Sequence, residues 1–491
     1  MKTTRKHAVI IGGGLGGLSL ALRLARRKID VTICEKNSRL GGKMNVHECE
    51  GFRFDTGPSL ITLLDVFSEA FQDAGASLED FVSPVRIDPL AHYVFSDGIE
   101  FKYTASIPDW NQTIERIGSP IRDRFYNFME LGARIYQLSK NTFFRQSPYQ
   151  FPPSLDLKVL KNFPLKYAWG KYSDTVAAFF ESPYLRQMFN RYPTYVGSSP
   201  YQTPATLTVI PYIEYAYGGW FIKGGLYKII ESMKELAEKN EVRILCNSDV
   251  HEITHRHSSV LGVKLENGQE IPADIVIMNG DASLTPLLLG SSAGSKYTPE
   301  HRSLSGIVFL VGTAKTLHGI HHHSIYFSAS YEKEFSQLFK ERRFPEDPTV
   351  YVNTASRTDR SLVQGEGEAC FIMANAPSND GNTWNQEMVD SAWNSVLGKL
   401  ISSGFPDIRK NIKYKTVWTP KDFADKYRMP GGAIYGQNSH GWKSTFLRPP
   451  NKDRRYGHLY YVGGSTHPGG GTPMVLLSAK ITCELIEKNE I

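Results

Sequence analysis

The sequence predicts an α/β fold that opens with a Rossmann-like unit. Residues 8–11 form a short apolar run that reads as a buried strand, and a glycine-rich turn follows it directly. From residue 18 to residue 25 the apolar positions recur with helical spacing, and residues 31–34 read as a second buried strand. At 491 residues the chain is too long for a single ordinary core, so we expect at least two domains.

The turn itself predicts a dinucleotide site. Gly12, Gly14 and Gly17 fit the spacing G-x-G-x-x-G, and Leu15 opens the helix whose N-terminus faces the expected phosphates. Glu35 ends the second strand, 18 residues after Gly17, where a carboxylate can accept both ribose hydroxyls of an adenosine. A βαβ unit that binds nothing is the alternative.

Composition excludes several classes of protein. Charged residues make up 22% of the chain and the net charge is +6, without a Lys/Arg run that would track nucleic acid. The five cysteines are scattered and form no C-x-x-C pair, which favours a reducing, cytoplasmic compartment without disulfides or structural zinc. No apolar run reaches the ~20 residues that a membrane-spanning helix needs.

The motif around Glu35 continues beyond the strand. Glu35-Lys36, four residues and then Gly41-Gly42-Lys43 resemble the flavin-dependent amine oxidase and phytoene desaturase superfamily. The resemblance implies FAD as the cofactor, with Lys36, Gly42 and Lys43 among the residues that bind it.

A second stretch, residues 52–60, resembles the F-D-x-G-P-S segment of phytoene desaturases. The resemblance implies that Gly57, Pro58 and Ser59 pass under the flavin ring, where small residues let the backbone approach a planar ligand. The alternative is a Gly-Pro turn into a helix near residues 61–71.

Residues 76–229 are rich in aromatic side chains, which fits either the core of a helical substrate domain or a wide apolar cavity or membrane-facing patch. Residues 191–201 and 218–225 resemble carotenoid desaturases. The first stretch looks closest to the branch that desaturates C-3,4 of 1-hydroxylated carotenoids.

Two later strands return the chain to the first domain. A helix from residue 226 to residue 240 precedes a strand at residues 242–246, and alternating apolar residues from Val250 to Val263 run into a hairpin at residues 266–268. Residues 273–282 resemble the A-D-x-V-V-x-N-A-D-A element of these desaturases. The resemblance implies Val250 and Asp281 as cofactor contacts.

The last motif is a strand, a glycine-rich turn and a helix from Pro473 to Glu487. It resembles the bacterial phytoene dehydrogenase signature G-A-G-T-H-P-G-x-G, which implies Gly464 and Met474 as cofactor contacts. Gly464 and Ser465 stand where alanine and glycine are common, a departure in the direction of the 3,4-desaturase branch.

Four histidines, at positions 318 and 321–323, suggest a metal site only superficially. Three adjacent side chains on a strand cannot all face one ion, and no carboxylate lies between residues 301 and 331 to complete a ligand set. We expect no metal.

The resemblance covers most of the chain and implies a discontinuous FAD-binding domain with an inserted mixed α+β substrate domain. The FAD domain would comprise residues 1–75, 230–300 and 440–491, and the substrate domain residues 76–229 and 301–439. We expect the protein to collect an insoluble polyene at a membrane surface without crossing the membrane.

The implied reaction removes two hydrogens from adjacent carbons of a long polyene, and Glu214 and His467 are the candidate proton acceptors. Each has a structural alternative: Glu214 in a salt bridge, His467 in the shape of its turn. Other activities left open are phytoene desaturation, amine or protoporphyrinogen oxidation on the same scaffold, and a carrier that has lost flavin. The final electron acceptor is open.

Overall fold

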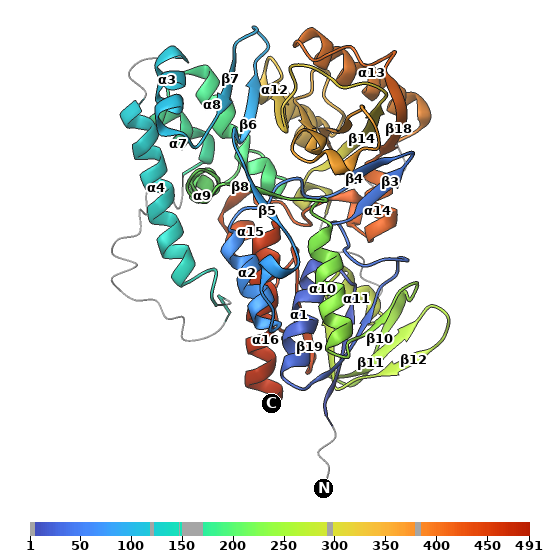
Figure 1. Cartoon of the computed structure of the whole chain (residues 1–491). Coiled ribbons are helices and arrows are strands. Elements are labelled where there is room, and N and C mark those ends of the chain that lie inside the picture. Colours follow the sequence, from blue (N-terminus) through green and yellow to red (C-terminus); the bar gives the residue numbers. More distant parts are fainter. Residues whose placement is uncertain (1–4, 118–121, 147, 150–169, 292–297, 379–383) are drawn as a thin grey trace.

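The computed structural model describes residues 5–117, 122–146, 148–149, 170–291, 298–378 and 384–491. Its lower half in Figure 1 is built on a parallel sheet with the strand order β19-β13-β1-β2-β9. These five strands are β1 (His7–Ile11), β2 (Asp30–Cys34), β9 (Arg243–Leu245), β13 (Ile275–Met278) and β19 (Leu459–Tyr461). The Rossmann-like α/β fold is thereby confirmed.

Both faces of this sheet are covered, which is why its strands are almost wholly apolar. On β1, Ala8 and Ile10 pack into the core that holds the helices, whereas Val9 and Ile11 pack against a small antiparallel sheet. The helices are α1 (Leu15–Arg26), α2 (Leu64–Asp73), α10 (Lys228–Lys239) and α16 (Thr472–Glu490). The small sheet comprises β10 (Val250–Arg256), β11 (Ser259–Leu265) and β12 (Glu270–Pro272).

The small sheet differs from expectation at one point. The alternating residues 250–263 are divided between β10 and β11, because the chain turns at His257, whose φ of 54° lies in the left-handed region. The hairpin expected at residues 266–268 joins β11 to β12.

The upper half contains a second, mixed sheet with the order β18-β14-β17-β16-β15-β6-β7. Its strands are β6 (Ala91–Val94), β7 (Glu100–Tyr103), β14 (Ser305–Thr313), β15 (His323–Tyr326), β16 (Val350–Asn353), β17 (Ala369–Ala376) and β18 (Ile412–Trp418). The strands of the lower sheet lie in the residues expected for the FAD domain, and those of the upper sheet lie in the residues expected for the substrate domain. The domain boundaries themselves stay a prediction.

Strand β14, which lies between β17 and β18, is buried on both faces. Ile307, Phe309 and Val311 pack with helix α13 (Gln386–Ser402), and Val308 and Leu310 pack with Phe52 and Phe54 of β4. Strand β4 (Phe52–Asp55) pairs with β3 (Val46–Cys49), and β5 (Pro84–Ile87) pairs with β8 (Gly219–Ile222). The first 75 residues thus contribute to the core of the upper sheet.

Five helices cover the other part of the upper sheet, at the left in Figure 1. They are α3 (Ile107–Ile117), α4 (Arg122–Asn141), α7 (Tyr172–Phe179), α8 (Pro183–Asn190) and α9 (Val209–Tyr217). Trp110, Phe125, Phe128 and Phe180 are fully buried in their core. These aromatic residues therefore form the core and not an exposed patch, whereas Phe151, Tyr167 and Trp169 lie outside the described residues.

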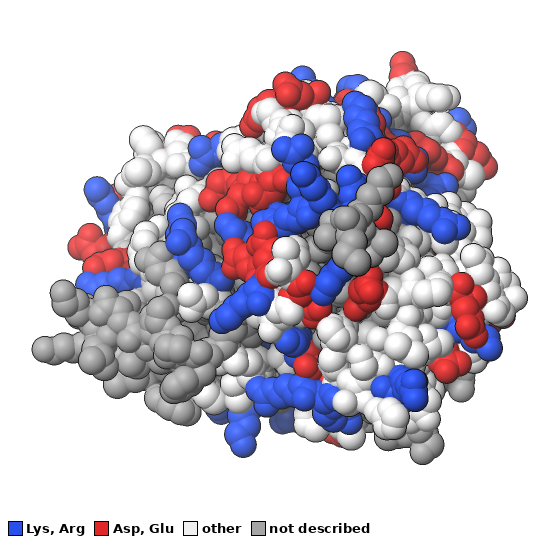
Figure 2. Space-filling model, turned by 90° about the horizontal axis from the view of Figure 1, so that it is seen from below, with Lys and Arg blue, Asp and Glu red and all other residues white. Residues whose placement is uncertain are grey.

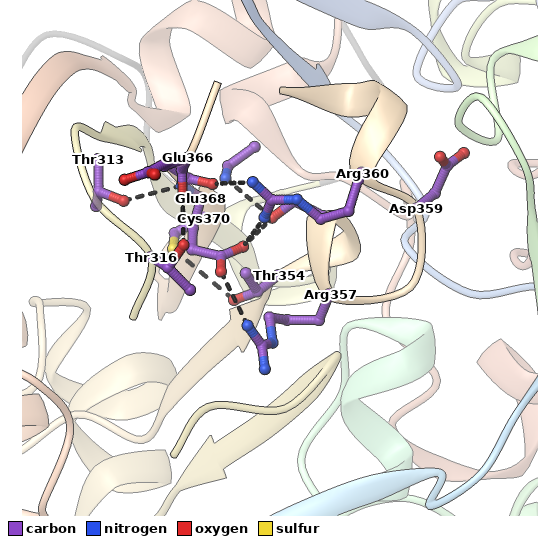
Figure 3. Close-up of polar contacts among 12 residues, drawn as sticks. Thr313, Thr316, Thr354, Arg357, Asp359, Arg360, Glu366, Glu368 and Cys370 are labelled. Carbon is purple, nitrogen blue, oxygen red and sulfur yellow. Dashed lines mark hydrogen bonds and ion pairs between the residues drawn. The ribbon is translucent and has the colours of Figure 1, made fainter. Parts of the chain in front are cut away.

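One buried carboxylate fastens the loop after β16 to the upper sheet (Figure 3). Glu368 is fully buried, and it accepts a hydrogen bond from Ser356 Oγ at 2.6 Å and ion pairs from Arg357 and Arg360 at 3.1 Å each. The same loop reaches the lower half, because the Asp359 carboxylate accepts from the Gly224 amide at 2.6 Å. This network explains how a carboxylate stays buried at low cost, since its charge is both paired and hydrogen-bonded.

The surface carries both signs of charge. Figure 2 shows basic and acidic side chains interspersed on the face seen from below. Elsewhere in the structure, ion pairs join Lys480 with Glu69 and Arg27 with Glu487. Among the described residues, no helix is both long and apolar enough to traverse a bilayer. The described part of the chain also holds no group of three His, Cys, Asp or Glu side chains placed to bind a metal.

Candidate functional site

The glycine turn lies at the carboxyl end of the five-stranded sheet. Gly12 has a φ of 98°, which favours glycine, and its amide donates to the Cys34 carbonyl at 2.8 Å. Gly14 is the N-cap of α1 and Leu15 is its first residue, so the free amides of the first helical turn point out of the sheet edge. Such an edge is where parallel α/β sheets bind ligands.

The three fingerprint glycines have different surroundings. A side chain on Gly17 would come within 2.6 Å of the Gly12 carbonyl oxygen, so this glycine permits close packing of helix on strand. A side chain on Gly14 would meet nothing in the described protein closer than 3.4 Å, and one on Gly12 nothing closer than 3.7 Å. Glycine at these two positions therefore leaves space open beside the backbone, as a bound pyrophosphate requires.

Glu35 is buried beside this turn. One carboxylate oxygen accepts from the Gly13 amide at 2.7 Å, and the other accepts from the backbone and side-chain nitrogens of Asn37 at 2.8 and 2.9 Å. These bonds occupy three of the roughly four acceptor positions of a carboxylate and leave one for a ribose hydroxyl. Lys36 is directed elsewhere, since its Nζ donates to the Asp425 carbonyl.

The second glycine pair joins the same loop. The Gly41 amide donates to the Gly13 carbonyl at 2.8 Å, and a side chain on Gly42 would come within 3.2 Å of Gly14 Cα. A side chain on Gly57 would collide with the Lys43 carbonyl oxygen at 1.8 Å, so Gly57 packs directly against the backbone of Lys43 and Met44. Beside Gly57 and Pro58, Ser59 turns its hydroxyl toward Tyr351 of the upper sheet.

A half-buried cation, Lys43, and a buried anion, Asp281, lie here without a direct ion pair between them. Lys43 Nζ donates to the Ile434 carbonyl at 2.6 Å, and burial lowers the pKa of Lys43 to about 8 although the Asp281 charge acts against the shift. Asp281 Oδ1 accepts from the Ser283 amide at 2.9 Å, whereas its buried Oδ2 has no partner among the described residues. An unpaired buried carboxylate oxygen is suited to accept a hydrogen bond from a ligand.

The remaining expected cofactor residues are Val250, Gly464 and Met474. Val250 begins β10, and its carbonyl accepts from Arg428 at 3.2 Å. Gly464 lies in the turn after β19, with ordinary contacts around it. Met474, in the first turn of α16, packs with Leu63, Tyr136 and Ile213 and so connects the lower half to the upper helices.

Sequence analysis did not identify Asn279 as a site residue. It follows β13, and its Nδ2 donates to the Gly12 carbonyl at 2.7 Å. The Asn279 side chain lies between the two glycine turns. A Cβ added to Gly16, Gly17 or Gly463 would come within 2.6 to 3.2 Å of it, so Asn279 fixes the two turns relative to each other. The available signal was its position, since the carboxyl ends of neighbouring parallel strands meet at one edge.

Glu214 lies apart from the glycine turns, in the core of the upper half. It is 2% exposed, and its two carboxylate oxygens accept from the hydroxyls of Tyr192 at 2.6 Å and Tyr195 at 2.7 Å. Within the described ranges, Glu214 therefore has a tyrosine shell and no direct ion pair. A role as proton acceptor stays a prediction.

His467 is fully buried in the turn before α16. Its ring lies edge-on to Phe143, with ring centroids 4.6 Å apart. Burial lowers the pKa of His467 to about 4, against an opposing effect of the Phe143 and Gln146 backbone, so the ring is neutral at pH 7. A neutral imidazole can accept a proton, but its role in the reaction is likewise untested.

Comparison with known proteins places the chain in a family and finds relatives that match it over almost its whole length. The family model described as flavin containing amine oxidoreductase matches residues 15–486. A 1-hydroxycarotenoid 3,4-desaturase of Flavobacterium sp. (strain P99-3) is 35% identical over 98% of this chain and 99% of its own. A 4,4'-diapolycopene oxygenase of Methylomonas sp. is 31% identical over 98% of each chain.

The fold has solved counterparts as well. The crystal structure of an oxidoreductase from Methanosarcina mazei has a TM-score of 0.67, with 17% identity over 97% of this chain and 100% of that one. At this identity the likeness supports the fold alone.

Proposed function

The chain belongs to the flavin-containing amine oxidoreductase family, and we propose that it is an FAD-dependent carotenoid desaturase acting at C-3,4 of a 1-hydroxylated carotenoid. It is a flavin-dependent oxidoreductase by its family and by the relatives it resembles over its full length. The observation that carries the finer proposal is the 35% identity, over nearly all of both chains, to a relative with that activity.

The site described above fits FAD. Open space beside Gly12 and Gly14 suits the pyrophosphate, the remaining acceptor position of Glu35 suits the ribose, and Asp281 Oδ2 suits a donor on the cofactor. Gly42, Lys43 and residues 57–59 would line the path between the pyrophosphate and the upper half, with Gly464 and Met474 opposite. In this assignment Val250 borders the adenosine end.

When bound, the flavin supplies a two-electron acceptor for hydride from the substrate. The protein must then hold the polyene in place, exclude water and accept one proton from the neighbouring carbon. Glu214 and the neutral His467 are the proposed acceptors, and the conjugated chain lowers the demand on either because it delocalises positive charge. A charged Lys43 beside the site would favour the extra negative charge of a reduced cofactor.

Expression in two carotenoid-producing hosts tests the proposal. One host accumulates phytoene and the other a 1-hydroxylated carotene, and the pigments are separated by chromatography. We expect a new, red-shifted product from the hydroxylated pigment alone. Coloured products from phytoene would instead identify a phytoene desaturase, and an oxygen-bearing product would indicate an activity like that of the diapolycopene oxygenase.

We further propose that the protein works at a membrane surface, because its substrate is insoluble in water. Trp442 and Leu447, in and just after helix α15 (Gly441–Phe446), are 40% and 44% exposed, and Lys443 lies between them. Aromatic and aliphatic side chains with a nearby cation suit an interface with anionic lipid. This surface replaces the aromatic core residues as the candidate contact.

Co-sedimentation with anionic and neutral vesicles tests this contact. We expect the protein to pellet with vesicles, and the double variant Trp442→Ser/Leu447→Ser to pellet less. Met388→Ser is the matched control, because Met388 is 38% exposed on α13 in another part of the molecule. Equal sedimentation of the double variant and the control would contradict the assignment of this surface.

A further inference from the structure

A guanidinium group is enclosed by aromatic rings inside the upper half. Arg191 is buried, and its guanidinium carbon lies 5.5, 5.1 and 4.9 Å from the ring centroids of Tyr93, Tyr192 and Tyr195. Its Nη2 donates to the hydroxyls of Tyr93 at 2.9 Å and Tyr195 at 3.1 Å. Burial of such a charge is costly unless the charge and all its donors are satisfied.

The charge is balanced, but one donor is not. Tyr195 receives a hydrogen bond from Arg191 and donates to Glu214, so a single hydroxyl relays the interaction between the buried cation and the buried anion. Arg191 Nε, however, is buried and has no acceptor among the described residues.

His323, on strand β15 of the upper sheet, has a second ring nitrogen without a hydrogen-bond partner among the described residues. His323 Nδ1 accepts from the Asn353 side-chain amide at 3.2 Å, and that amide is oriented by its contact of 3.3 Å with the His322 carbonyl. The Tyr351 hydroxyl lies 2.7 Å from the same Nδ1 and therefore donates to it. These two donors fix the ring proton on Nε2, which is buried and has no acceptor in the described part of the chain.

The two unused donors belong to one region. In the upper sheet Ile325 pairs with Tyr93 on one side and with Tyr351 on the other, so these side chains share a face with His323, two residues earlier on β15. Arg191 lies over the ring of Tyr93 on that face. Burial, the neighbouring His322 and the Arg191 charge together hold the pKa of His323 well below its usual range.

The region is also connected to the glycine turns. Because Tyr351 donates to His323, its oxygen is left to accept from Ser59 Oγ at 2.6 Å. Ser59 follows Gly57, which packs on Lys43 of the candidate cofactor site. A directed line of hydrogen bonds therefore runs from the cofactor side of the molecule to His323.

We propose that Arg191 and His323 form an oxygen-binding site for a polar end group of the polyene, and that this site determines the choice of substrate. The proposal rests on the proposed function, since it assumes a long apolar substrate. Arg191 Nε–H and His323 Nε2–H both need an acceptor, which a hydroxyl or carbonyl oxygen provides and a hydrocarbon end does not. Without such an oxygen, both donors stay buried and unpaired, which disfavours an unoxidised analogue.

Equilibrium binding tests this inference without requiring that the protein catalyse the proposed desaturation. The purified holoprotein in detergent micelles is titrated with a 1-hydroxylated acyclic carotene and with the same carotene lacking the hydroxyl group, and flavin fluorescence reports occupancy. We expect wild-type protein to bind the hydroxylated carotene more tightly. Arg191→Met, which keeps the volume and removes the donor, should reduce the ratio of the two dissociation constants by about tenfold to a hundredfold.

Two further variants guard against loss of folding. Arg191→Met leaves Glu214 without its compensating charge, so the double variant Arg191→Met/Glu214→Gln, which removes both charges, should show the same loss of discrimination. His323→Leu should show a smaller loss in the same direction, because its donor is neutral. Retained flavin and the melting temperature establish that each variant is folded.

Tyr172→Phe is the matched control for Tyr195→Phe. Each removes one buried hydroxyl from the aromatic core, but that of Tyr172 donates to the Phe189 carbonyl and not to the Arg191 cluster. We expect Tyr195→Phe to weaken discrimination and Tyr172→Phe to preserve it. A folded Arg191→Met protein with the wild-type ratio, or a wild type that binds both carotenes equally, overturns the proposal. A wild type that discriminates in binding but forms no product contradicts only the proposed desaturation.

Discussion

The lower and upper halves of the molecule solve the problem of binding in different ways. At the lower glycine turns, the backbone forms most of the site, through the space beside Gly12 and Gly14 and the amides at the start of α1. Glu35 adds a single side-chain carboxylate. In the upper half, the polar groups are side chains assembled inside an aromatic core, with Arg191 and Glu214 joined through Tyr195.

The two sites should therefore respond differently to amino-acid substitutions. A site made by backbone depends on the absence of side chains at a few positions, so adding atoms destroys it. A site made by buried charges depends on partners, so removing atoms leaves the remaining charge uncompensated. The following experiments test that contrast, from the largest expected effect to the smallest.

Gly14→Val should abolish retention of FAD while leaving the protein folded, because the new side chain occupies open space and not protein. Flavin absorbance after gel filtration measures the loss, and circular dichroism checks the fold. Gly398→Val is the control and should keep its flavin, because Gly398 is exposed on α13 and an added Cβ there would meet no described atom within 4 Å. Full flavin content in Gly14→Val would mean that the pyrophosphate lies elsewhere.

Glu214→Ala should destabilise the protein by about 3–5 kcal/mol, because it leaves the Arg191 charge buried without compensation. Thermal melting reports the effect. Glu235→Ala removes a carboxylate from an exposed i,i+4 pair with Lys239 on α10 and should cost only about 0.2–0.5 kcal/mol. Similar melting temperatures for the two variants would show that the tyrosine shell alone satisfies Arg191.

Glu35→Ala should weaken FAD binding by about 1.5–3 kcal/mol through loss of hydrogen bonds to a charged acceptor. Titration of the apoprotein with FAD measures this change. Lys36→Ala provides the comparison within the same motif, because the Lys36 ammonium is bonded to the Asp425 carbonyl. We expect a smaller loss from Lys36→Ala, and the reverse order would assign Lys36 to the cofactor.

The pH dependence of stability should have opposite signs at His440 and Asp55. Burial lowers the pKa of His440 to about 4, so between pH 6.5 and 4 the unfolded chain binds a proton that the folded chain does not, and stability falls as the pH falls. Burial raises the pKa of Asp55 to about 6, despite bonds from the Leu226 and Tyr227 amides. Here the folded chain binds the proton first, and stability rises as the pH falls through 6.

Melting temperatures between pH 7 and pH 4.5 separate the two contributions. His440→Gln should flatten the loss of stability on acidification, whereas Asp55→Asn should make it steeper. The exposed His257 supplies a control, and His257→Gln should leave the slope unchanged. Parallel curves for His440→Gln and wild type would show that folding does not lower the pKa of His440.

The same contrast explains what sequence could predict. The glycine turns, the strand before Asp281 and the helix after Pro473 were predictable, because each depends on neighbouring residues and on backbone geometry. The pairing of Arg191 with Glu214 was not, although both lie in stretches that sequence analysis singled out, because no local rule joins residues of different elements through Tyr195. Arg428 was not predictable for the same reason, since it contacts a segment far away in sequence. Asn279 could be inferred only from the topology, because it follows β13 at the edge where β1 also ends. The turn at His257 was not predictable either, because the residue with the left-handed φ is a histidine, whereas such turns are recognised in a sequence by glycine.

The position of β19 has a consequence for how the protein is made. This strand pairs with β13, and α16 packs on α1, so the lower core joins the beginning of the chain to residues synthesised more than four hundred positions later. During translation, the outer edge of β13 and the face of α1 that α16 covers stay without a partner until the end of the chain is made, and pairing across such a separation is slow. Cofactor capture is therefore expected to follow synthesis of α16, and nascent chains that lack it should depend on chaperones.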